Sequence, residues 1–250
     1  MKVKAHFDSF NFSSFNMEAY FTDDSYLIET VKSIGVFEPH RWIQEFKKTL
    51  SSNIIEAKIL HTSAGLTLPV KRFSSKPLKQ TLELAGLKGY SEKSKFLLEL
   101  LKRMWKEIQD EVITRIDVAI DFKGKVPTKV IKELSKSRTP FKYLNTVYSK
   151  TKSEKKTNPH LDIKVYNKAL HANLDEEMER LEFCFKGGYF RGNLQIKDLD
   201  EASQKMSKTI KRMSGLDVDI LTFKDCYKLL CILIFINMDL EPMIWCFQAL

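Results

Sequence analysis

The sequence lacks most of the short motifs that define well-known enzyme classes. Its 250 residues contain no Walker loop, no G-x-G-x-x-G, no H-E-x-x-H and no G-x-S-x-G. The five histidines are scattered, and no two of them have the spacing of a metal-binding pair on one strand. These absences argue against the chemistry of P-loop nucleotide hydrolases, zinc proteases and α/β-hydrolases.

Cysteine pairs and membrane segments are absent as well. The four cysteines are Cys184, Cys226, Cys231 and Cys246, and none forms a C-x-x-C pair. Three lie in apolar surroundings, which is typical of reduced, buried thiols. The most apolar run, residues 229–236, is far shorter than the roughly 20 residues of a membrane helix. Residues 1–5 are polar and basic with no apolar segment after them, so we expect a cytoplasmic protein without a signal peptide or a membrane partner.

Positive charge is in excess. Lysine and arginine total 41 against 32 aspartates and glutamates, which gives a net charge of +9 spread along the chain. A folded basic protein often binds nucleic acid, because neutralising phosphates releases counterions. The alternative is a basic surface that serves only solubility. The hydrophobic content of 43% is enough for a sizeable core.

Three segments place ionisable groups on one strand face and apolar groups on the other. They are residues 113–122, 161–168 and 179–186. Alternate side chains of a strand point to opposite faces, so each segment has one polar face. These faces carry Arg115, Asp117 and Asp121; Asp162, Lys164, Tyr166 and Lys168; and Arg180, Glu182 and Lys186. If the three strands share a sheet, acids, bases and a tyrosine meet on one surface.

The remaining periodicity predicts a mixture of strands and helices. Further strands are expected over residues 4–13, 54–60, 66–73, 78–85 and 141–149, and helices over 24–34, 39–50, 91–108, 128–137, 198–213 and 223–238. The fold class is therefore α+β, with a largely antiparallel central sheet that has helices on one face and a polar catalytic face. We expect one domain over residues 1–250, with a motif-bearing core at about 78–190 and a C-terminal helical part at about 196–250. The charged loop at 150–158 either is a solvated turn or binds a phosphate backbone.

The acids on the polar face predict a site for a divalent metal ion. Asp117 and Asp121 are four residues apart, about 13 Å along an ideal strand, so one would bind the metal and the other would anchor a basic side chain. Glu182, and more distantly Glu83, could complete the carboxylate set. Oxygen ligands of this kind suit Mg²⁺ or Mn²⁺. The alternative is a set of surface ion pairs, each of small energetic value.

Tyr166 is the candidate nucleophile. On the same strand face it is flanked by Lys164 and Lys168, and nearby cations favour the phenolate form of a tyrosine. Such a tyrosine can form a covalent bond to phosphorus. The alternative is a half-exposed strand tyrosine with no chemical role. His160 and His171 bracket this strand and could reach its ends, although loop histidines are the simpler interpretation.

Taken in order, these segments resemble the replication initiation factor family. These are the Rep-trans-type initiators of rolling-circle plasmids, related to the HUH endonucleases and to some conjugative relaxases. The family shows T-R-x-D-x-A-x-D-F, then R-I-Y-x-K, then R-x-E-x-x-x-K. The matching segments are Thr114–Phe122, Ile163–Lys168 and Arg180–Lys186, and the resemblance extends from about residue 78 to about 237. Lys164 stands in place of the family's arginine, which keeps the charge but loses bidentate phosphate geometry.

The resemblance implies a site-specific nickase and strand transferase that acts on single-stranded or hairpin origin DNA. Tyr166 matches the family's nucleophile, which forms a 5′-phosphotyrosyl intermediate and leaves a free 3′-hydroxyl. The matching acids are Asp117, Asp121 and Glu182, with Glu83 less closely matched. Arg115, Lys164, Lys168, Arg180 and Lys186 are the expected DNA-binding or acid-orienting residues. A host helicase is a further expected partner. Two alternatives remain, a conjugative relaxase with the same chemistry and a non-catalytic DNA-binding regulator.

Overall fold

The structure, a computed structural model, describes residues 2–14, 29–30, 41–44, 54–61, 67–73, 76–88, 92–143, 145–151 and 160–221. The strands in these ranges are β1 (Lys2–Ser14), β2 (Arg41–Gln44), β3 (Ile54–His61), β4 (Thr67–Phe73), β5 (Lys76–Ala85), β6 (Val112–Lys123), β7 (Arg138–Tyr143), β8 (Thr146–Thr151), β9 (Leu161–Asn167), β10 (Met178–Lys186) and β11 (Asp217–Leu221). The helices are α2 (Glu92–Ile108), α3 (Thr128–Ser137), α4 (Lys168–Ala172) and α5 (Leu199–Ser214), with short 3-10 turns at Gly187–Phe190 and Ile196–Asp198.

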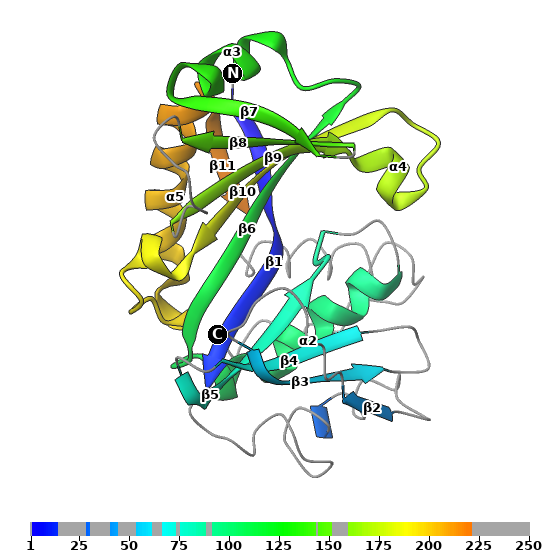
Figure 1. Ribbon diagram of the computed structural model, residues 1–250, viewed down its shortest axis with the longest axis vertical. Helices are drawn as coiled ribbons and strands as arrows, with labels where there is room; N and C mark the ends of the chain where they lie inside the picture. Colours follow the sequence, from blue (N-terminus) through cyan, green and yellow to red (C-terminus); the bar gives the residue numbers. More distant parts are fainter. Residues whose placement is uncertain are drawn as a thin grey trace, which may run out of the picture.

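The strands form one curled sheet in the order β2-β3-β4-β5-β1-β6-β10-β9-β8-β7, and β11 pairs with β1 (Figure 1). Every pair of neighbouring strands is antiparallel except β1 and β11, which run parallel. Figure 1 shows α5 beside β11 on one side of the curl and α2 on the other. The architecture is the α+β fold with a largely antiparallel sheet that the sequence predicts.

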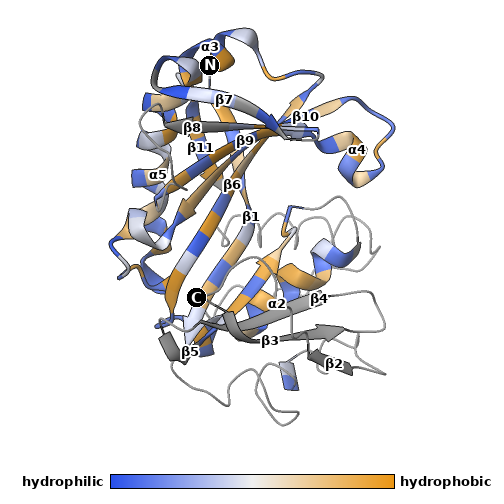
Figure 2. Ribbon diagram, viewed as in Figure 1, coloured by the Kyte–Doolittle hydropathy of each residue, from blue (hydrophilic) through white to orange (hydrophobic). Residues whose placement is uncertain are grey.

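The sheet has one apolar face because its central strands alternate in polarity. Ile116, Val118 and Ile120 of β6 are buried, and Figure 2 shows hydrophilic and hydrophobic residues alternating along this strand. Apolar side chains of α2, α3 and α5 join those of the strands in a single buried cluster. Burying one Leu, Ile or Phe side chain stabilises a protein by about 1.5–3 kcal/mol. This cluster is therefore the main source of stability among the described residues.

The helices end and pack where local sequence favours it. Leu97, Leu100, Leu101 and Met104 recur at three- and four-residue spacing and are all buried, so α2 presents one apolar stripe to the sheet. α5 ends at Gly215, whose φ of 72° is left-handed and whose N–H donates to the Lys211 carbonyl. A residue with a Cβ pays a conformational cost there that glycine avoids.

β1 joins the two parts of the sheet. Lys2–His6 pair with β11, and the chain from Ser9 onward pairs with β5 on the same edge, while β6 lies along the other edge. At Asp8 the register between β1 and β6 shifts by one residue, which is a β-bulge. This bulge accompanies a buried Asp8 side chain that meets Arg180 on the polar face.

Arg180 is the largest fully buried side chain of the described residues, with 0% exposure. Its guanidinium forms two hydrogen bonds to the Asp121 carboxylate, at 2.6 and 2.9 Å. It also lies 2.7 Å from Asp8 and donates to the Lys88 carbonyl at 3.0 Å. A buried charge is tolerated only when it is paired and hydrogen-bonded, and these contacts provide that pairing. Arg180 therefore links β10 to β6, β1 and the turn after β5.

Most sequence predictions of elements are confirmed to within two residues at each end. These are the strands predicted over 4–13, 54–60, 66–73, 78–85, 113–122, 161–168 and 179–186, and the helices predicted over 91–108, 128–137 and 198–213. Of the helix predicted over 24–34, Glu29 and Thr30 are helical and the rest lies outside the described residues. The helix predicted over 223–238 and the loop residues 152–158 also lie outside them.

The helix predicted over residues 39–50 is wrong where the structure describes it. Residues 41–44 form β2, which pairs antiparallel with β3. Short apolar runs do not distinguish helix from strand by periodicity, and here the backbone partners that β3 offers decide the outcome. The sequence also missed β11, because its pairing with β1 joins the two ends of the described chain.

Two further boundaries differ from the prediction. The strand predicted over 141–149 is a hairpin of β7 and β8, which closes where Tyr143 pairs with Thr146. Lys168, predicted as the end of a strand, begins α4 instead. Asn167 causes this change, because its side-chain oxygen accepts the Leu170 N–H at 2.8 Å and caps the new helix. No helix of the described residues is long and apolar enough to cross a membrane.

Replacing Arg180 with methionine should destabilise the fold strongly. The substitution keeps an apolar stem but leaves the buried Asp8 carboxylate and the Asp121 carboxylate, whose side chain is 10% exposed, without their cation. Breaking such a buried pair costs about 3–5 kcal/mol in the free energy of unfolding. The matched control is Arg103→Met, which removes an exposed ion pair to Glu99 and should cost less than about 1 kcal/mol. Urea unfolding of the two variants measures the difference, and equal losses would contradict the role of Arg180.

Candidate active site

The candidate active site lies on the polar face of β6, β10 and β9. Strand register places Cys184 opposite Asp117, and Glu182 opposite Lys164. Tyr166 lies opposite Arg180, two pairs further along β9 and β10 and on the same face. Because β10 runs between β6 and β9, groups from all three strands converge on Glu182. The three motif segments share one sheet, which is the condition under which their polar faces meet.

Glu182 is the centre of this site. It is 3% exposed, and its carboxylate accepts hydrogen bonds from Lys164 Nζ at 2.6 Å, from the Tyr166 hydroxyl at 2.8 Å and from Cys184 Sγ at 3.3 Å. Burial alone would raise its pKa. The charge and hydrogen bond of Lys164, with the hydrogen bonds from Tyr166 and Cys184, outweigh burial and lower the pKa of Glu182 to about 2. Glu182 is therefore ionised at neutral pH.

Asp117 is the second buried carboxylate, with 1% exposure. Arg115 donates to it through Nε at 2.7 Å and also through Nη2. Burial raises the pKa of Asp117, and the nearby charge of Glu182 raises it further. The Arg115 hydrogen bond lowers it only in part, and the pKa of Asp117 is about 6. The two acids of the site thus differ in pKa because their environments differ.

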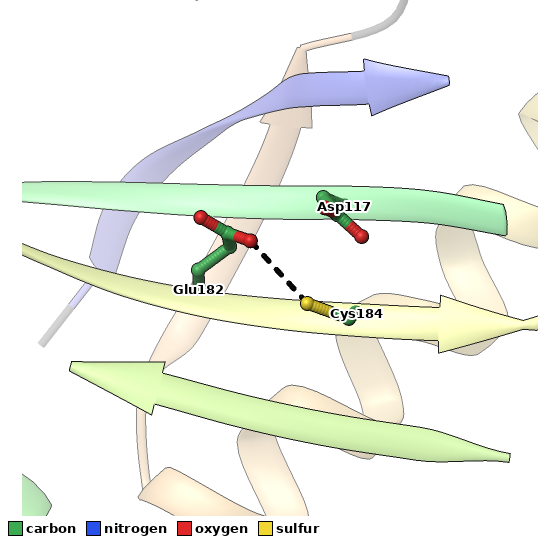
Figure 3. Close-up of side chains that lie close together, drawn as sticks. All are labelled: Asp117, Glu182 and Cys184. Carbon is green, nitrogen blue, oxygen red and sulfur yellow. Dashed lines mark hydrogen bonds between the residues drawn. The ribbon is translucent and has the colours of Figure 1, made fainter. Parts of the chain in front are cut away.

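Asp117, Glu182 and Cys184 form a group that could hold a metal ion. Their ligand atoms lie within 4.8 Å of one another and all three residues are buried (Figure 3). The two carboxylates fit Mg²⁺ or Mn²⁺, which commonly take one or two protein carboxylates and keep several waters. The Cys184 sulfur is a softer donor than these two ions prefer, and burial raises the pKa of its thiol, so the two carboxylates are the main ligands of the group. Sequence reasoning missed Cys184 as a member of this group, although Cys184 lies between Glu182 and Lys186 on the same face of β10.

The other two predicted metal ligands lie apart from this group. Asp121 is held by Arg180, so it is the carboxylate that anchors a base, as one of the two strand aspartates was expected to do. Glu83 lies on β5 opposite Asn11, and two strands, β1 and β6, separate β5 from β10. Neither carboxylate belongs to the group of Asp117, Glu182 and Cys184.

Tyr166 is half-buried and its hydroxyl donates to Glu182. Burial and the adjacent Glu182 charge raise the pKa of Tyr166 well above its ordinary value of 10. The expectation that neighbouring lysines favour the phenolate is therefore wrong for the free protein. Lys164 is engaged by Glu182, so its charge stabilises that carboxylate first. In this state Tyr166 is a protonated hydrogen-bond donor.

The predicted DNA-binding residues fall into two groups. Arg180 has no exposed surface and orients acids instead. Arg115, Lys164, Lys168 and Lys186 are partly exposed and lie around the site. Lys186 pairs with Asp162 at 2.6 Å. Burial and the Arg180 charge lower the pKa of Lys168.

Sequence reasoning missed one buried acid and undervalued one histidine. Asp8 contributes to the site through Arg180, but only the bulge in β1 brings it there. His171 packs against the Tyr166 ring, with ring centroids 5.2 Å apart. Its position five residues after Tyr166 was a usable signal, because a helical turn after a strand returns the chain toward it.

No protein-family model matches the chain, and no curated protein matches it. Among solved structures it is similar to the rolling circle replication initiator protein from Geobacillus stearothermophilus. The TM-score is 0.46 and the sequence identity is 14%, over 84% of this chain and 85% of that chain.

The coupling between the two acids predicts how a substitution changes their titration. Glu182→Gln should lower the pKa of Asp117 below about 6, because it removes a neighbouring negative charge and releases Lys164. Carboxyl ¹³C shifts of Asp117 followed against pH measure this value, and Asp117→Asn identifies the signal. An unchanged or raised midpoint in the Glu182→Gln protein would show that the two carboxylates are not coupled.

Metal affinity should depend on two acids of the polar face and not on a third. Asp117→Asn or Glu182→Gln should weaken Mn²⁺ binding by at least about tenfold, because each removes an oxygen ligand from the group. Glu83→Gln is the matched control and should leave the affinity unchanged. Titration followed by the electron paramagnetic resonance of free Mn²⁺ gives the dissociation constants. Equal weakening by all three variants would contradict the assignment.

Proposed function

We propose that the protein is a site-specific nickase and strand transferase for single-stranded DNA that initiates rolling-circle replication. The observation that carries the proposal is the contact of the Tyr166 hydroxyl with Glu182, beside Asp117, on one sheet face. A phenol, two carboxylates and several cations from three strands meet there. The three motif segments that resemble the replication initiation factor family supply all of these groups.

The reaction is a transesterification at phosphorus. The Tyr166 oxygen attacks the scissile phosphate, the bond from phosphorus to the 3′-oxygen breaks, and a 5′-phosphotyrosyl bond forms. The departing 3′-oxygen takes a proton and becomes a free 3′-hydroxyl that a polymerase can extend. Attack by a second 3′-hydroxyl on the phosphotyrosyl bond releases Tyr166 and rejoins a strand. No oxidant, reductant or nucleotide is consumed.

Glu182 is the group that can receive the phenol proton, because it lies 2.8 Å from the hydroxyl oxygen. Lys164 keeps the pKa of Glu182 near 2, which makes it a weak base in the free protein. A DNA phosphate that draws Lys164 toward itself would weaken that contact and make Glu182 more basic. Substrate binding and proton transfer would then be linked through a single lysine.

Asp117 and Glu182 would hold the divalent ion, with Cys184 beside them. Such an ion supplies positive charge to the non-bridging oxygens of the scissile phosphate. Arg115, Lys164, Lys168 and Lys186 would hold neighbouring phosphates, and their charge gives binding a strong dependence on salt.

Two related functions use the same surface. A conjugative relaxase would perform the same reaction at a transfer origin, and the sequence of the nicked strand distinguishes the two. A non-catalytic regulator would bind DNA without cleaving it. The protonated, hydrogen-bonded state of Tyr166 in the free protein is compatible with that role. The regulator function predicts salt-dependent DNA binding with no covalent product in the presence of any divalent metal ion.

Tyr166→Phe should abolish a covalent protein–DNA product, because it removes the attacking oxygen. The assay incubates protein and Mn²⁺ with a pool of 3′-labelled single-stranded oligonucleotides, with and without hairpins. The 3′ label stays with the protein through the phosphotyrosyl bond and migrates with it in a denaturing gel. A 5′ label should leave with the fragment that ends in the 3′-hydroxyl.

Tyr189→Phe is the matched control, because Tyr189 is also partly buried but bonds Thr209, away from the acids. It should form the product at the rate of the wild-type protein. An undiminished product in the Tyr166→Phe protein would refute the assignment of the nucleophile. Salt-dependent DNA binding without any product in the wild-type protein would favour the regulator.

A further inference from the structure

His171 lies against the Tyr166 ring without belonging to any of the three motifs. The two rings are nearly perpendicular, at 87°, with centroids 5.2 Å apart. This is the edge-to-face arrangement that aromatic rings prefer within 4.5–7 Å. His171 is exposed, so its contact with Tyr166 is formed at the rim of the site and not within the core.

Local sequence fixes the position of His171. α4 begins directly after β9, because Asn167 caps it through the Leu170 N–H. It ends at Asn173, which has a φ of 52° and donates its N–H to the Ala169 carbonyl. This single helical turn has defined ends on both sides, and its Ala169 is buried. The chain therefore returns His171 to Tyr166 with little freedom.

The Tyr166 side chain is consequently held at two points. Its hydroxyl is bound to Glu182 and its ring is packed by His171. The first restraint is lost when the phenol gives up its proton and its oxygen turns toward phosphorus. The second involves the ring and not the hydroxyl, so it does not depend on the phenol proton. An attacking group gains rate when its orientation is fixed before the chemical step.

We propose that His171 is a positioning residue for the nucleophile, which orients the Tyr166 ring during attack on the scissile phosphate. The inference rests on the nickase function proposed above. It assigns the role to the ring of His171 and to its packing, and not to a proton on the imidazole. A residue of this role changes the rate of the covalent step and leaves DNA affinity unchanged.

The test compares three substitutions of His171 in the single-turnover formation of the covalent product. His171→Ala should slow the rate at saturating DNA by about three- to tenfold, the range expected for loss of one aromatic pair. His171→Phe keeps a ring edge and should restore most of the rate. His171→Gln keeps polar atoms without a ring and should stay slow. The DNA concentration at half-maximal rate should change by less than about twofold in all three.

Leu170→Ala is the matched control, since Leu170 is the neighbouring residue of α4 and is 61% exposed. It should leave the rate unchanged. Equal rates for the wild-type and His171→Ala proteins would overturn the positioning role and leave the nickase function standing. Rescue by glutamine with failure of phenylalanine would also overturn it, because a polar atom would then be the active feature. Absence of any product from the wild-type protein would overturn the nickase function and this role together.

A measurement without DNA tests the contact itself. The ring ¹H and ¹³C signals of Tyr166, identified by their loss in the Tyr166→Phe protein, should shift when His171 becomes alanine, because the imidazole ring current is removed. They should stay in place in the Leu170→Ala protein. An unshifted Tyr166 signal in the His171→Ala protein would show that the rings are not in contact and would refute the proposal.

Discussion

The site depends on the antiparallel register that sets β10 between β6 and β9. This register places Glu182 opposite Lys164, and Cys184 opposite Asp117, so two carboxylates share one buried surface. Two like charges at this distance repel each other, and burial removes the water that would screen them. Each acid is therefore matched by its own cation, Arg115 for Asp117 and Lys164 for Glu182. A shift of β10 by one residue in this register would turn Glu182 and Cys184 to the other face, away from Asp117 and Lys164.

The same pairing gives the two acids different chemical states. Glu182 is held ionised by Lys164 with a pKa of about 2, whereas the pKa of Asp117 is about 6. The Tyr166 hydroxyl donates a hydrogen bond to the stronger acid, Glu182, and remains protonated. Tyr166, the two carboxylates and their two cations thus form a network whose charges balance. Under the proposed function, an anionic strand bound beside Lys164 would change the partners of this lysine first.

Period-two alternation was sufficient to predict the polar face. Alternation assigns Asp117, Tyr166 and Glu182 to the polar face of their own strands, because residues two apart on a strand share a face, and it brings them together only if the three strands share one sheet. The alternation of side chains along a strand does not determine which neighbour a side chain binds. The sequence therefore did not predict that Lys164 would favour Glu182 over Tyr166, which reverses the expected pKa of the phenol. It also did not predict Asp8, since a one-residue bulge changes the parity of β1, and bulges have no reliable signal in a single sequence.

The position of β1 has a consequence for how the chain acquires this structure. β1 is the earliest described strand, yet it pairs with β5, β6 and finally β11, near the far end of the described residues. The Asp8 carboxylate at its bulge pairs with the Arg180 guanidinium, which is synthesised much later. Closing such distant pairs is slow, because the loops between them lose entropy before any contact compensates. We expect the newly synthesised N-terminal segment to lack its native strand pairings until synthesis of the sheet is nearly complete.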